Sequence, residues 1–283
     1  MGRIGINTAC VQRKSKRSIM EILDFALKNG FSAIEFKDEY PFFEEMSDAE
    51  KTDAREIIKK HDLFCSVHLP FADMNISALK PVLREAAVRV LVDSLKNSAE
   101  IGATAVTVHG GNINALNYGE EWFEVSQERT NTSLRQLQEV AATKGIRLSV
   151  ENLHEFSARL KRVHSRPEDL LRCRKLLGET TGFTLDIGHA FSTPLKPVDF
   201  VRQLEAEHIL MIHIHDNNGL EDQHLAVGDG KIDFPAFFQA YTEEGWAFTL
   251  MIETRNVKQA LLSKERIENL LMAGGRKLSD GRG

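Results

Sequence analysis

HILMIHIHDNNGLEDQHLAVGDGKID, residues 208–233, is the stretch of sequence from which the fold follows. Its apolar run at 209–213 is typical of a strand that is covered on both faces in a parallel sheet. The polar loop that follows carries His215, Asp216, Asp222 and His224. Imidazoles and carboxylates just beyond the C-terminal end of a buried parallel strand indicate a metal-dependent enzyme built on a barrel.

The same arrangement recurs along the chain, because short apolar runs alternate with longer amphipathic ones. Strands are predicted at 3–6, 32–36, 63–68, 104–109, 146–151, 182–186, 208–213 and 247–253. Helices are predicted at 17–29, 47–61, 79–101, 124–144, 166–178, 197–206, 233–243 and 257–273. Eight strand–helix units predict an α/β fold, a single (β/α)8 TIM barrel with its active site at the C-terminal mouth. A doubly wound open sheet is the alternative, but no phosphate-binding loop follows the first strand.

The bulk properties of the chain narrow its class further. Its 283 residues suit one TIM-barrel domain over 1–283, with a frayed tail at about 274–283. The net charge of −5 gives no overall attraction to nucleic acid or anionic membranes. Three cysteines without a CxxC pair, an N-terminus without the apolar core of a signal peptide, and the absence of 18 uninterrupted apolar residues lead us to expect a cytoplasmic protein with no membrane partner.

The residues at the ends of the predicted strands form the candidate site. Strands three to eight end in His68, His109, Glu151, Asp186, His213 and Glu253, and the loops behind them add His189, Asp222 and His224. A single histidine at a strand end is usually a hydrogen-bonded surface group. Six such residues in succession would repel one another or stay unsatisfied without a metal ion. The pattern therefore predicts a metal site.

Several motifs resemble those of a known family. They are SVENL around Glu151, TLDIGHA with Asp186 and His189, IHIHDN at His213, DQHLAVGDGKIDF, and MIET at Glu253. With them the chain resembles the xylose-isomerase-like TIM barrels, which include sugar isomerases and epimerases and the endonuclease IV apurinic-site nucleases. In the epimerase branch the resemblance implies one divalent ion (Mn, Zn, Co or Mg) held by Glu151, Asp186, His213 and Glu253. In the nuclease branch it implies three zinc ions, held in addition by His68, His109, His189, Asp222 and His224.

The isomerase or epimerase interpretation assigns a role to each part of the site. The substrate is a small sugar or sugar phosphate, and Glu151 and Glu253 are the catalytic groups that move a proton through an enediolate. Glu35, His215 and Arg255 are expected to contact the substrate, and Lys37 is a further candidate for a phosphate. One metal ion is expected, with three as the upper limit.

The alternative is an endonuclease IV-like, zinc-dependent apurinic-site phosphodiesterase. Two features argue against nucleic acid as a partner. The loop after the second strand, KDEYPFFEEMSDAE at 37–50, is acidic where DNA phosphate would pass, and Gly188 stands where the nucleases favour cysteine. A related lyase, such as a sugar dehydratase, and a non-enzymatic scaffold are further alternatives. The sequence allows a homo-oligomer without specifying one.

Overall fold

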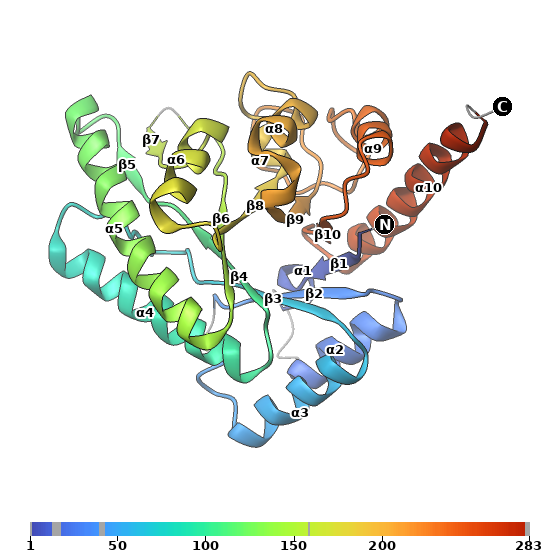
Figure 1. Ribbon diagram of the computed structural model, residues 1–283, viewed down its shortest axis with the longest axis horizontal. Helices are drawn as coiled ribbons and strands as arrows, with labels where there is room; N and C mark the ends of the chain where they lie inside the picture. The colour runs from blue at the N-terminus through green and yellow to red at the C-terminus, as the bar shows by residue number, and fades with distance from the viewer. Residues whose placement is uncertain (1, 13–17, 40–42, 158, 281–283) are drawn as a thin grey trace.

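The structure is a computed structural model of the chain, and it describes residues 2–12, 18–39, 43–157 and 159–280. Eight parallel strands close into a barrel in the order β1-β10-β9-β8-β6-β4-β3-β2 (Figure 1). Their bounds are β1 Ile4–Asn7, β2 Ala33–Lys37, β3 Phe64–His68, β4 Ala105–His109, β6 Arg147–Glu151, β8 Gly182–Asp186, β9 Ile209–Ile214 and β10 Thr249–Ile252. The predicted (β/α)8 barrel is confirmed, and each strand lies within two residues of its predicted bounds.

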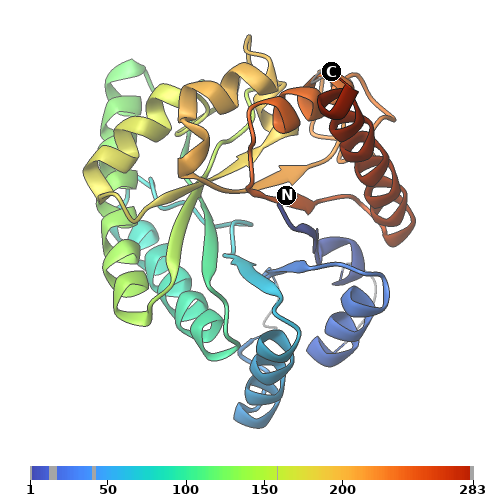
Figure 2. The same ribbon diagram turned by 45° about the vertical axis from the view of Figure 1, so that its right-hand side comes forward.

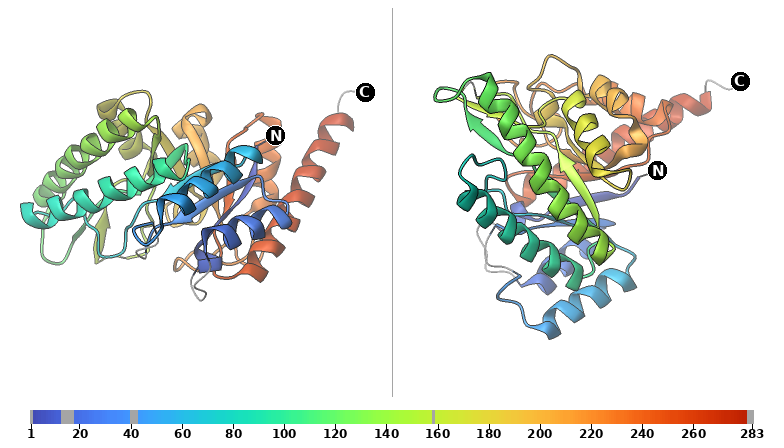
Figure 3. Two further views of the ribbon diagram at one scale, coloured as in Figure 1. Left: turned by 90° about the horizontal axis from the view of Figure 1, so that it is seen from below. Right: turned by 60° about the vertical axis from the view of Figure 1, so that its left-hand side comes forward.

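Helices form a ring outside the barrel (Figure 2). The principal ones are α2 Ile19–Lys28, α3 Asp48–Lys60, α4 Pro81–Glu100, α5 Glu120–Lys144, α6 Pro167–Leu177, α8 Pro197–Leu204, α9 Phe234–Glu243 and α10 Val257–Asp280. Ser18 and Ser47 begin α2 and α3 with capping boxes, in which the serine and a glutamate three residues later satisfy each other's backbone N–H groups. Figure 3 shows α4 and α5 side by side along one flank. The predicted helix start at 17 lies outside the described residues.

The inward-facing side chains of the barrel are stacked in layers, because side chains alternate in direction along a strand. The lowest layer is apolar and contains Ala33, Ala105, Met211 and Met251. Two residues further along the strands the layer is polar and hydrogen-bonded; it contains Glu35, Ser66, Thr107, Ser149 and Thr184. The next inward positions are the strand-end histidines and carboxylates. The period of two therefore carries the candidate site residues into one volume at the C-terminal mouth.

Four short elements have no counterpart in the sequence prediction. They are α1 Ala9–Gln12, α7 Ile187–Ala190, and the antiparallel pair β5 Asn112–Asn114 and β7 Leu160–Arg162. A 3-10 turn at Ala206–His208 also precedes β9. The β5–β7 pair joins two loops that are far apart in sequence and lies near the start of α5 (Figure 1). Strands of three residues within long loops are too short to show a period of two.

The predicted tail is wrong for most of its length. Helix α10 continues through residues 274–280, and residues 281–283 lie outside the described part of the chain. No described helix is long and apolar enough to cross a membrane.

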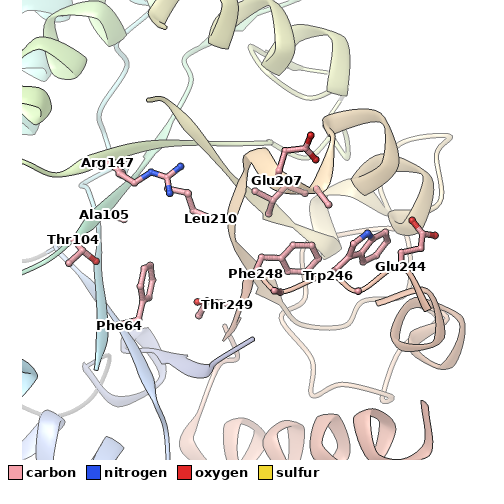
Figure 4. A pocket seen from close by; sticks show the side chains of 14 residues that line it. Phe64, Thr104, Ala105, Arg147, Glu207, Leu210, Glu244, Trp246, Phe248 and Thr249 are labelled. Carbon is pink, nitrogen blue, oxygen red and sulfur yellow. The ribbon is translucent and has the colours of Figure 1, made fainter. Parts of the chain in front are cut away.

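The N-terminal end of the barrel holds a cavity of about 510 Å³ that is distinct from the predicted site. Figure 4 shows Phe64, Arg147, Trp246 and Phe248 around it, with Glu207 and Glu244 at its rim. Three aromatic rings line it, and the strand-end histidines lie at the other end of the barrel. The N-terminal end of a TIM barrel serves stability, whereas the chemistry is built at the opposite mouth.

Candidate active site

The nine predicted metal-ligating side chains all gather at the C-terminal mouth. Each lies within 3.9 Å of another member of the set, which comprises His68, His109, Glu151, Asp186, His189, His213, Asp222, His224 and Glu253. Seven of the nine line a cavity of about 290 Å³, while Asp186 and His213 lie beneath its wall with no exposed surface. The barrel therefore brings the whole predicted set together.

Glu151 lies at the centre of this cluster. Its Oε2 atom is 3.2 Å from Nε2 of His68 and 3.0 Å from Nε2 of His109, and its Oε1 atom is 3.2 Å from Nδ1 of His213. Burial alone would raise the pKa of this carboxyl, but the charges and hydrogen bonds of His109 and His213 outweigh burial and hold the pKa well below its ordinary value. Glu151 is thus an ionised carboxylate that several donors share.

A second group is built around Asp186 and Asp222. The Nε2 atom of His215 is 3.1 Å from both carboxylate oxygens of Asp186, and the backbone N–H of His189 donates to Oδ1 of Asp186 because Asp186 is the N-cap of α7. Asp222 lies 3.0 Å from Nε2 of His224 and 3.5 Å from Nε2 of His189. Against the effect of burial, His189 and His224 lower the pKa of Asp222.

The donor atoms fit divalent metal ions in three places. Within each of three groups one ligand atom per residue lies within 4.8 Å of the others; the groups are His68, His109 and Glu151; Glu151, Asp186 and His213; and His215, Asp222 and His224. Imidazole nitrogen and carboxylate oxygen together suit Zn, Mn or Co. Because Glu151 belongs to two groups, it is placed to bridge two ions.

The fourth predicted ligand of the inner group, Glu253, follows β10 directly. Its Oε2 atom is 3.1 Å from Nδ1 of His213, the same nitrogen that faces Glu151. Its Oε1 atom is 3.4 Å from Nζ of Lys37, which also lies 4.4 Å from the ring centre of Phe71. Burial favours a raised pKa for Glu253, but Lys37 and then His213 lower it below its ordinary value. Lys37 is therefore already ion-paired with a carboxylate of the site.

The three residues expected to contact substrate lie elsewhere. Glu35 has no exposed surface, lies beneath the metal-ligand cluster and faces His213. His215 has no exposed surface either and is held against Asp186. Arg255 is exposed beyond β10 and is not part of the cavity wall. Substrate contact at these three positions stays a prediction: Glu35 lies behind His213, His215 belongs to the donor group with Asp222 and His224, and Arg255 lies outside the cavity wall.

Other residues of the cavity wall have no signal in the sequence prediction. Asn112 comes from β5, Leu160 and Arg162 come from β7, and Leu153 follows β6. The pairing of β5 with β7 brings these loop residues over the cluster, and no local period marks them. His154, which the sequence predicts to be structural and a secondary candidate for substrate contact, also lines the cavity, and its ring centre is 5.3 Å from that of His189. Burial lowers the pKa of His154 to about 4.

Comparison with known proteins agrees with this architecture. A family model described as a xylose isomerase-like TIM barrel matches residues 23–272. An uncharacterized protein of Methanocaldococcus jannaschii is 31% identical over 230 residues, which cover 80% of this chain and 76% of that protein. The crystal structure of a D-tagatose 3-epimerase-like protein superposes with a TM-score of 0.84 at 26% identity, covering 98% of this chain and 99% of that one.

A further relative overturns one expectation. Probable endonuclease 4 of Mycobacterium leprae is 28% identical over 185 residues, which cover 63% of this chain and 68% of that protein. An endonuclease acts on nucleic acid. The prediction that nucleic acid is not a partner of this chain is therefore wrong. It relied on the acidic loop at 37–50, of which residues 40–42 lie outside the described residues, on Gly188 in α7 and on net charge. The loop and the net charge do not describe the mouth where the candidate ligands gather.

Proposed function

Since the chain belongs to the xylose isomerase-like TIM-barrel family, we propose that it is a metal-dependent sugar isomerase or epimerase. One observation carries the proposal: Glu151 and Glu253 approach the same atom, Nδ1 of His213, at 3.2 and 3.1 Å. One carboxylate at the end of β6 and another just after β10 thus converge on one atom directly beneath the wall of a small cavity. This is the arrangement that proton removal and return at a sugar carbon require.

The residues divide the chemistry between them. Glu151, Asp186, His213 and Glu253 would hold one divalent ion, which when bound polarises a substrate carbonyl and acidifies the neighbouring C–H bond. One of the two glutamates removes that proton to give an enediolate, and the other, or the same one, returns it. Phe71 stacks on His109 with ring centres 4.5 Å apart and, with Leu153 and Leu160, gives the cavity an apolar wall that restricts water.

Size and similarity support a small substrate. The cavity volume of about 290 Å³ lies just below the range of small-molecule sites, which begins at about 300 Å³. The likeness to the D-tagatose 3-epimerase-like protein extends over nearly the whole length of both chains. A monosaccharide is the substrate class that suits a cavity of this volume beside two carboxylates.

The test is a screen for proton exchange in heavy water. The protein, supplied with Mn, Co, Zn or Mg in turn, is incubated with a panel of ketoses and aldoses and their phosphate esters, and deuterium incorporation is followed by NMR. Exchange at the carbon beside the carbonyl is expected for at least one sugar. Lack of exchange across the panel with every metal would reject the proposal.

A second candidate function is favoured by the outer donor groups. The sets His68, His109, Glu151 and His215, Asp222, His224 offer places for two further ions, and the chain is 28% identical to probable endonuclease 4. Three ions suit a phosphodiester, whose charge they offset, and a zinc-dependent apurinic-site nuclease would use them. The metal content of the purified protein and an activity assay distinguish the two functions. Close to three zinc ions per chain after purification without added metal, together with cleavage of DNA at an abasic site, would favour the nuclease. One ion with sugar exchange favours the epimerase or isomerase.

A further inference from the structure

We propose that Arg162 and His154 form a binding site for the phosphate group of a phosphorylated sugar beside the candidate metal centre. This inference rests on the proposed sugar chemistry and names the class of sugar. Arg162 ends β7, outside the barrel strands that supply the metal ligands. It lies in the wall between the cavity of the metal centre and an adjoining groove of about 460 Å³, and both spaces share His154, Leu160 and Arg162.

The hydrogen bond between the two residues fixes where the protons of His154 lie. Nη2 of Arg162 is 3.2 Å from Nε2 of His154. A guanidinium only donates, so Nε2 of His154 must accept, and the ring proton lies on Nδ1. Nδ1 of His154 and Nε of Arg162 are both buried atoms without a hydrogen-bond partner among the described residues. Both atoms are enclosed, so an anion in the cavity would meet the other N–H groups of the Arg162 guanidinium, which the hydrogen bond to His154 holds in place.

The guanidinium of Arg162 likewise has no carboxylate at ion-pair distance among the described residues; burial lowers its pKa, and the charge of Asp222 opposes this from further away. The other cations that line these two spaces each form an ion pair: Lys37 with Glu253, Lys161 with Glu120, and Arg166 with Glu155. Within the part of the chain that the structure describes, no carboxylate forms an ion pair with Arg162. A half-buried guanidinium without a partner costs free energy unless an anion binds to it.

A phosphate group is the anion that this geometry suits. A guanidinium donates in a planar fork that matches phosphate oxygens, and a phosphate monoester has three terminal oxygens that can accept from Arg162, while His154 holds the guanidinium in place. His154 lies next to His189, with ring centres 5.3 Å apart, and His189 lies 3.6 Å from Glu151. The imidazole of His189 thus lies between the proposed phosphate site and Glu151, so a sugar can have its carbonyl at the metal and its ester at Arg162.

The direct test measures binding of inorganic phosphate by calorimetry to the full chain with its metal as purified. Arg162→Gln is expected to weaken phosphate binding at least tenfold, as loss of a charge-assisted hydrogen bond does, and Arg162→Lys to weaken it less. The matched control is Arg166→Gln, which removes an arginine of the same groove that Glu155 already pairs. Its phosphate affinity is expected to stay within about twofold of wild type, since a partner already satisfies that charge. Circular dichroism and melting curves confirm that each variant is folded.

Several results would overturn the phosphate site. They are unchanged phosphate affinity in folded Arg162→Gln, an equal loss in Arg166→Gln, or binding of acetate as tight as that of phosphate. The proton-exchange screen distinguishes failure of the phosphate-site proposal from failure of the proposed sugar chemistry. If an unphosphorylated sugar exchanges as well as its ester and Arg162→Gln changes neither, the sugar function stands and the phosphate site falls. If no sugar exchanges but phosphate binding depends on Arg162, the phosphate site stands without the sugar chemistry.

Discussion

Nε2 of His213 lies 2.6 Å from Oε2 of Glu35, and neither residue has exposed surface. The carboxylate is itself held in place, since Asn7 donates to Oε2 at 2.8 Å and Thr107 donates to Oε1 at 2.7 Å. Since Nε2 of His213 lies on the side of Glu35, Nδ1 is the nitrogen that faces Glu151 and Glu253. A carboxylate behind a metal-ligating histidine orients the ring and raises its basicity.

Replacing Glu35 should therefore weaken metal binding without touching a ligand. Glu35→Gln is expected to lower the affinity for the first metal ion by about 10–100-fold, as is usual when a partner behind a ligand is lost. Competition against a chromogenic chelator measures this affinity. Asp38→Asn is the matched control. Asp38 directly follows β2 and is also buried, but it accepts a hydrogen bond from Ser94 and does not contact a candidate ligand. Equal metal affinity in wild type and Glu35→Gln would contradict the assigned role.

The two converging glutamates should each be needed for turnover. Glu151→Gln and Glu253→Gln are each expected to slow proton exchange by at least about 10²-fold, the usual contribution of a general acid or base. The rate of deuterium incorporation into the sugar found in the screen is the measurement. A conservative change at Asp222, which belongs to the outer donor groups, serves for comparison. If either glutamine variant exchanges at nearly the wild-type rate, the two-carboxylate mechanism is wrong.

Lys37 should set the acidic limit of activity. Burial raises the pKa of Glu253, but Lys37, 3.4 Å away, is the largest influence in the opposite direction and the pKa ends below its ordinary value. Loss of the ammonium in Lys37→Met should raise that pKa, so the carboxylate protonates at higher pH and the acidic limb of kcat/KM moves upward. Lys161→Met, which loses an ion pair with exposed Glu120, should leave the limb in place. Identical pH profiles for all three proteins would refute this role of Lys37.

Asp38 should make the protein less stable as pH rises. Burial, despite a hydrogen bond from Ser94, raises the pKa of Asp38 to about 7, with Glu44 and Glu39 adding to the rise. The folded chain therefore holds a proton that the unfolded chain releases near pH 4, and the free energy of unfolding falls between about pH 4 and pH 7 by about 1.4 kcal/mol per pKa unit.

The variant Asp38→Asn removes this titration and keeps an acceptor for Ser94. Urea denaturation at pH 5 to 8 should show the variant gaining stability over wild type as pH increases. Asp53→Asn, on the exposed side of α3, should follow wild type throughout. A difference between Asp38→Asn and wild type that does not change with pH would contradict the raised pKa.

The features that could be predicted from the sequence are those that depend on a local pattern of residues. The period of two along a strand places Thr184 and Asp186, or Ser149 and Glu151, on the same inward side, and strand ends in a closed barrel share one mouth. Each strand could therefore be predicted from its own residues, and the six strand-end candidates followed once eight strands were counted, whereas the full set of nine ligands is what the family resemblance implies. The short strands β5 and β7 were missed because three-residue strands have no period to detect, and with them Arg162 and Asn112 were missed as parts of the cavity wall.

By itself the sequence determined the barrel, the mouth and the identity of the side chains that reach it, because these depend on alternation within single strands. Only the tertiary structure decided which residues lie behind these side chains in the barrel interior and which loop residues cover them. Glu35 on β2 faces His213 on β9 across the interior of the closed barrel, although the two strands are not neighbours in it. Arg162 and His154 lie eight residues apart in the loop between β6 and α6, and this loop is joined to a distant one by the pairing of β7 with β5. Contacts across a barrel or between loops depend on chain closure over long sequence separations, and no local spacing encodes them.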